Sequence, residues 1–114
     1  IHLSPINPQL ILDEWRRLGL PVPSRALEVF RIPSSILNES RTVVCHLSTG
    51  NPRKDYFPFK AHEYQESHSV SPEQIAEWRD QNAKGMAAFW YSATPHILTM
   101  EPIDVTGLEV FEIS

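Results

Sequence analysis

Two helix-start signals constrain the fold of this chain most. They indicate two helices, and strand-like segments fill the sequence between and after them. Asn7-Pro8 places an N-cap residue before a proline, and Ser71-Pro72-Glu73-Gln74 is a capping box with proline at the first helical position. Apolar residues at helical spacing and a terminal Gly19 predict a helix over 8–18. The capping box predicts a second helix that ends before Gly85.

The remaining segments are rich in β-branched and aromatic residues and are bounded by prolines or turn sequences. Strands are expected at 26–32, 41–48, 56–66, 86–92, 96–100 and 108–113, with a short helical turn at 34–37. Residues 86–92 are apolar on both faces, which is typical of a central strand. The order α-β-β-β-α-β-β-β lacks the regular alternation of a parallel sheet. It predicts an α+β fold, with a mostly antiparallel sheet of about five to six strands and two helices packed on it.

Length and composition exclude several classes of protein. A chain of 114 residues fits a single domain, 1–114, and 41% hydrophobic residues argue against disorder. One cysteine excludes an internal disulfide framework and a multi-cysteine zinc site. No apolar run approaches the roughly 20 residues that span a bilayer, so no membrane role is expected. No signal peptide is visible, and we expect a cytoplasmic protein or one delivered as part of a larger chain.

The charge is unevenly distributed, and its overall sign disfavours a general nucleic-acid binder. The net charge is −4, but residues 1–60 carry about +3 and residues 61–114 about −7. The acidic residues of the second half are Glu63, Glu66, Glu73, Glu77, Asp80, Glu101, Asp104, Glu109 and Glu112. Such a section can steer a basic partner towards the protein.

The first hypothesis is therefore a small interaction domain of the inhibitor, immunity or accessory type. The helix after Ser71 has a thin apolar stripe and is expected on the surface, where Trp78 would anchor a protein partner and Glu77 and Asp80 would steer it. Arg53 and Lys54, in a loop with Ser48-Thr49-Gly50, are the candidate residues for holding a phosphate. This hypothesis requires no cofactor and no metal ion.

The alternative is a small effector-type enzyme that acts on RNA or a nucleotide. If 56–66 is a strand, alternation places Lys60, His62 and Tyr64 on one face, with Glu66 and His68 following. His62 and His68 would act as acid and base in a metal-independent ribonuclease, and Lys60 or Arg53 would hold phosphate. A strand face exposed to solvent has the same alternation of side chains, so an exposed strand without a catalytic role remains an alternative interpretation.

An ADP-ribosyl transferase is part of the same alternative. Arg31, Ser48-Thr49 and a late Glu109 or Glu112 occur in the order used by ADP-ribosyltransferase toxins, but the Glu-x-Glu pair is missing. No family is assigned on these residues.

The remaining candidates have stronger structural explanations. His62-Glu63 begins like H-E-x-x-H, but position 66 is Glu, so that zinc motif is absent. Cys45 and His46 point to opposite faces of a strand, and a lone cysteine among valines is usually a small buried hydrophobe. Phe89-Trp90-Tyr91 is expected to fill the core.

Overall fold

The computed structural model describes residues 1–46 and 56–114. The elements in chain order are β1 (His2–Leu3), α1 (Pro8–Leu18), β2 (Leu27–Arg31), η1 (Ser34–Ile36), η2 (Glu39–Arg41), β3 (Thr42–His46), β4 (Tyr56–Pro58), η3 (Ala61–Glu63), α2 (Pro72–Ala83), β5 (Pro95–Thr99) and β6 (Glu109–Ile113). The three η elements are single turns of 3-10 helix. No helix in the described ranges is long and apolar enough to cross a bilayer.

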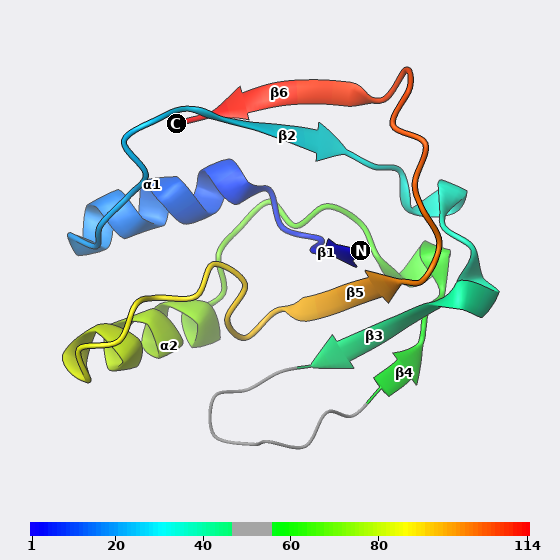
Figure 1. The fold of residues 1–114 in the computed structure, drawn as a ribbon. Helices are drawn as coiled ribbons and strands as arrows, with labels where there is room; N and C mark the ends of the chain where they lie inside the picture. The colour runs from blue at the N-terminus through cyan, green and yellow to red at the C-terminus, as the bar shows by residue number, and fades with distance from the viewer. Residues whose placement is uncertain (47–55) are drawn as a thin grey trace.

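The strands form two antiparallel sheets. One has four strands in the order β1-β5-β3-β4, and the other is a two-stranded ribbon of β2 and β6. Together with the two helices, they confirm the predicted α+β fold (Figure 1). Strand β1, which was not expected, forms an edge of the four-stranded sheet beside β5.

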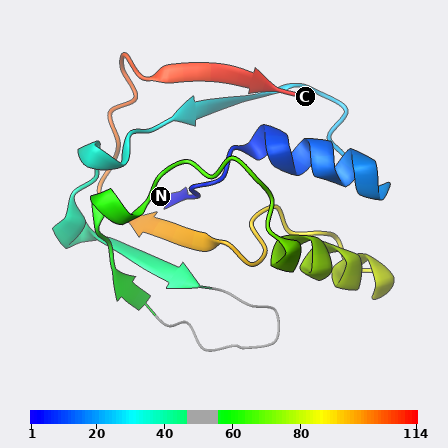
Figure 2. The same cartoon turned by 180° about the vertical axis from the view of Figure 1, so that it is seen from behind.

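Helix α1 forms where its local signals predict. The Asn7 side chain accepts a hydrogen bond from the Gln9 N–H, and Gly19 ends the helix with φ of 74°, a left-handed conformation that glycine adopts without steric cost. The helix buries Ile11, Leu12 and Trp15. Strand β6 runs above α1 in Figures 1 and 2, and the buried Ile113 closes this end of the ribbon.

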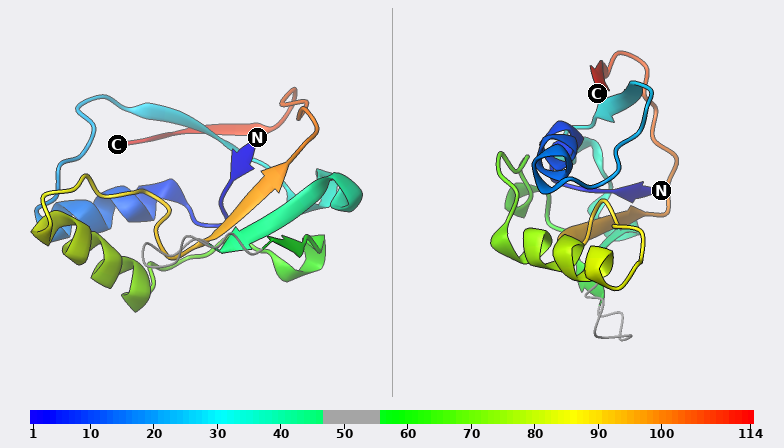
Figure 3. Two further views of the ribbon diagram at one scale, coloured as in Figure 1. Left: turned by 60° about the horizontal axis from the view of Figure 1, so that its bottom comes forward. Right: turned by 90° about the vertical axis from the view of Figure 1, so that its left-hand side faces the viewer.

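Helix α2 begins at the capping box, but its expected surface position is wrong. Gln74, Trp78 and Gln81 form a buried stripe, and the Trp78 side chain has no exposed surface. The Trp78 ring meets the Trp15 ring edge-on, with centroids 5.8 Å apart, because α1 and α2 lie side by side (Figure 3). The apolar stripe was thin because two of its three buried positions are glutamines.

The central strand predicted at 86–92 does not form. The Phe89 N–H donates to the Gln81 side chain at 3.0 Å, and the Phe89 carbonyl accepts from Trp78 Nε1 at 2.6 Å. These bonds to α2 replace the ladder bonds that a strand would make. Trp90 packs on Trp15 with ring centroids 5.4 Å apart, and Trp90 and Tyr91 contact the core between the helices, outside any sheet. The expected place of Phe89 in the core is wrong, because Phe89 is 53% exposed.

The strand predicted at 56–66 is also wrong beyond its first residues. Strand β4 ends at Pro58, which has no N–H to extend the ladder, and the turn η3 follows. Phe59 is buried in a second core cluster with Leu37, Val44 and Ile97. The alternation on which the enzyme hypothesis depends is therefore interrupted between Lys60 and Tyr64.

Candidate functional site

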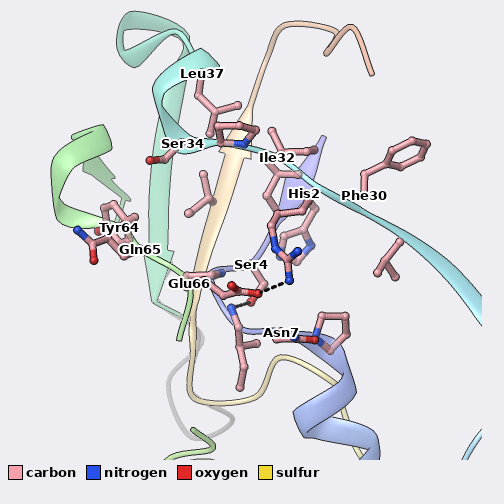
Figure 4. Close-up of a pocket in the computed structure, with 18 of the residues that line it drawn as sticks. His2, Ser4, Asn7, Phe30, Ile32, Ser34, Leu37, Tyr64, Gln65 and Glu66 are labelled. Atoms are coloured by element: carbon pink, nitrogen blue, oxygen red, sulfur yellow. Dashed lines mark hydrogen bonds and ion pairs between the residues drawn. The ribbon is translucent and has the colours of Figure 1, made fainter. Parts of the chain in front are cut away.

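One face of the β2–β6 ribbon is exposed along its whole length. The register pairs Glu28 with Glu112 and Phe30 with Val110, and all four side chains are exposed. Phe30 and Val110 each retain 48% of their accessible surface. In Figure 4 the Phe30 ring points away from the other labelled side chains. We call these four residues the outer face of the ribbon.

The outer face combines apolar surface with unneutralised negative charge. Carboxylates directly opposite each other on adjacent strands repel and lower the stability of a sheet. Among the described residues, no ion pair joins Glu28 or Glu112 to a cation. The free protein therefore carries two side-by-side carboxylates next to an exposed aromatic ring.

The inner face of the ribbon is held by Arg31. Its guanidinium pairs with Glu109 at 2.6 Å and with Glu66 at 3.1 Å, and it lies 4.7 Å from the centre of the Phe111 ring. A dashed line to Glu66 in Figure 4 marks the second pair. The hydrogen bonds that the Arg31 guanidinium donates to the Glu109 and Glu66 carboxylates raise the pKa of Arg31 above its ordinary value. Arg31 thus connects the ribbon to the segment beside β1. Of the residues considered for ADP-ribosyl transfer, Arg31 and Glu109 meet in this ion pair.

Only some of the α2 residues that were expected to bind a partner have exposed side chains. Trp78 is enclosed in the core, so it cannot anchor a partner without unfolding its surroundings. Asp80 is exposed and is paired with Lys84 at 2.8 Å, whereas Glu77 is half-buried. Arg53 and Lys54 lie outside the described residues.

The proposed catalytic residues of the alternative do not share a face. The His62 side chain is 79% exposed on η3, with Glu63 at 4.0 Å. Tyr64 stacks on the buried Phe59 with ring centroids 5.5 Å apart, and burial raises the pKa of its phenol. Lys60 and His68 are exposed, and among the described residues no hydrogen bond or ion pair joins either of them to His62.

A histidine pair that sequence reasoning missed connects β1 to β5. His2 Nε2 and His96 Nδ1 lie 2.5 Å apart, and His96 Nε2 lies 3.0 Å from the Tyr91 carbonyl oxygen. That carbonyl only accepts, so His96 carries its proton on Nε2 and its Nδ1 accepts from His2. The two residues are 94 positions apart, and no local pattern links them.

Cys45 has the buried position on β3 that the sequence predicts for it. Within residues 1–46 and 56–114, no three His, Cys, Asp or Glu side chains gather as metal ligands.

Comparison with known proteins identifies no relative of this chain. No protein-family model matches the chain, and neither a curated protein nor a solved structure is significantly similar to it.

Proposed function

We propose that this protein is an interaction domain that docks a basic partner on the outer face of the ribbon. The observation that supports the proposal is the unneutralised pair Glu28 and Glu112 beside the exposed pair Phe30 and Val110. An apolar centre next to charged groups is the usual composition of a binding surface.

The charge of the outer face determines the kind of partner. A lysine or arginine placed between Glu28 and Glu112 would replace their repulsion with two attractions. An apolar side chain beside that cation would cover Phe30 and Val110. The partner surface is therefore a basic residue next to an apolar one.

The aromatic anchor of this proposal is Phe30 in place of Trp78. Burial of one such side chain contributes about 1.5–3 kcal/mol, which corresponds to roughly tenfold or more in affinity. The acidic side chains of α2, Glu73 and Glu77 among them, would act at longer range by steering. No observation in the described residues favours the enzymatic alternative.

The test is affinity capture from the native lysate with matched variants of the full chain. We expect a basic protein whose recovery falls at least tenfold with Phe30→Ser, and again with the Glu28→Gln/Glu112→Gln double variant. Met100→Ser is the control, since Met100 is 77% exposed and lies outside the ribbon. Equal recovery of every captured protein by all variants would contradict the proposal.

A further inference from the structure

A cavity of about 670 Å³ lies between β1 and the ribbon. Its lining includes two unbroken runs, residues 1–8 and residues 29–34. In an extended strand only alternate side chains point to one side. Unbroken runs therefore mean that the main chains of β1 and β2 form walls of the cavity. Figure 4 shows side chains from both walls around it, including His2, Ser4 and Ile32.

Each wall includes a strand edge that has no neighbour among the described residues, although Ile6, farther along the first wall, forms a bridge to Ser67. Among the described residues, β1 pairs only with β5, and β2 pairs only with β6. Ile1 exchanges two backbone hydrogen bonds with Thr99, at 2.9 and 3.0 Å. Antiparallel pairs alternate, so the N–H and C=O of His2 point to the edge away from β5. Strand β2 lies on the β1 side of β6, so its free edge faces the same space (Figures 1 and 2).

The size of the cavity matches a short strand. Strands lie about 4.8 Å apart, sheets pack about 10 Å apart and a residue rises about 3.4 Å, which gives about 160 Å³ for each residue of an inserted strand. A volume of about 670 Å³ therefore holds about four residues.

The walls define the chemistry of the occupant. Leu3, Val29, Ile97 and Phe111 contribute apolar surface, so apolar side chains suit the interior. At the ribbon, Arg31 is paired with two carboxylates, Glu66 and Glu109, which leaves one net negative charge at this site. A basic residue next to the apolar stretch complements that charge.

We propose that this groove binds an extended, apolar peptide segment of about four residues, flanked by a lysine or arginine, as a strand between β1 and β2. The inserted strand hydrogen-bonds to both edges and joins the four-stranded sheet and the two-stranded ribbon into one sheet of seven strands. This inference does not rest on the proposed function, because three of the four outer-face residues, Glu28, Val110 and Glu112, do not line the groove.

The probe is a heptapeptide, selected from a random displayed library on the full chain and then synthesised with one N-methyl group at each position in turn. A strand held on both sides uses every central N–H, so N-methylation at each of about four consecutive positions should weaken binding about tenfold. Val110→Ser, which alters the outer face at a residue that does not line the groove, should leave the peptide affinity unchanged.

Four outcomes would overturn the proposal. If N-methylation weakened binding only at every second position, the peptide would be hydrogen-bonded to a single strand edge elsewhere. If N-methylation weakened binding at no position, the protein would bind the side chains of the peptide and not its backbone. Failure to select any binding peptide would mean that the groove takes no strand. Concentration-dependent dimers in sedimentation experiments that Val29→Trp abolishes would assign the groove to a second copy. Val110→Ser separates the two proposals, because it should leave the peptide affinity unchanged and should lower recovery of the basic partner in the capture experiment.

Discussion

Glu28 and Glu112 face each other across the two strands of the ribbon, and no described cation is paired with either. Three positions away along each strand, Glu109 is paired with Arg31 on the other face. The same ribbon therefore has an inner face on which a cation is paired with carboxylates and an outer face on which two carboxylates repel each other. The outer face costs stability in the free protein, and a basic partner would remove that cost.

The first prediction is that Glu112→Gln stabilises the free protein. Loss of the cross-strand repulsion should raise the free energy of unfolding by about 0.2–1 kcal/mol, and the gain should shrink with added salt. Glu109→Gln is the matched control, since it removes an ion pair and should lower stability by up to about 1 kcal/mol. Urea unfolding at low and high salt measures both. A Glu112→Gln protein less stable than wild type would show that this carboxylate is neutralised in the free state.

The second prediction concerns Trp78. Trp78→Ala should lower the free energy of unfolding by about 3–5 kcal/mol, because it opens a cavity between α1 and α2. Trp78→Phe should cost less, since it keeps most of the apolar volume and loses mainly the hydrogen bond to the Phe89 carbonyl. Thermal unfolding followed by circular dichroism separates the variants. A Trp78→Ala protein as stable as wild type would place Trp78 on the surface after all.

The third prediction is the tautomer of the histidine pair. The Tyr91 carbonyl 3.0 Å from His96 Nε2 requires a proton on that nitrogen, and Nδ1 then accepts from His2 Nε2. Long-range ¹⁵N–¹H spectra of the imidazole rings should show both neutral histidines in the Nε2–H form. An Nδ1–H signal for His96 would contradict this arrangement.

The fourth prediction is a loss of stability at alkaline pH that depends on Tyr91. Burial raises the pKa of the Tyr91 phenol above 10.0, so the neutral form is favoured in the folded state. The stabilising contribution is fully present below the unfolded pKa of about 10 and is lost as the pH rises through the folded pKa. Tyr91→Phe should flatten the decline in unfolding free energy above about pH 10. The exposed Tyr56 provides the control, since Tyr56→Phe should leave the decline in place.

The elements that the sequence predicted correctly are those with local signals. Helix α1 matches its predicted bounds, because Asn7 and Gly19 act on residues next to them. The segment 86–92 was predicted wrongly because its backbone partners, Trp78 and Gln81, lie on a helix whose packing no local pattern reveals.

The candidate site could be predicted only in its general character. Leu-Glu-Val-Phe occurs at 27–30 and again at 108–111, yet the register places Phe30 outward and Phe111 inward. The sequence predicted a binding surface on the helix after Ser71 with Trp78 as its anchor, and that anchor is wrong because Trp78 is buried. The facing of Glu28 and Glu112 depends on a pairing between strands about 80 residues apart along the chain. Sequence spacing cannot supply that register.

The most direct test of the account is photo-cross-linking from the outer face. One variant of the full chain would carry p-benzoyl-phenylalanine in place of Val110. A second variant of the same chain would carry it in place of Met100, which is exposed outside the ribbon. The account predicts that the Val110 probe forms one cross-linked complex in the native lysate, joined to a segment of the partner that contains Lys or Arg, and that the Met100 probe does not. A partner cross-linked equally from both positions, or from Met100 alone, would contradict docking on the outer face.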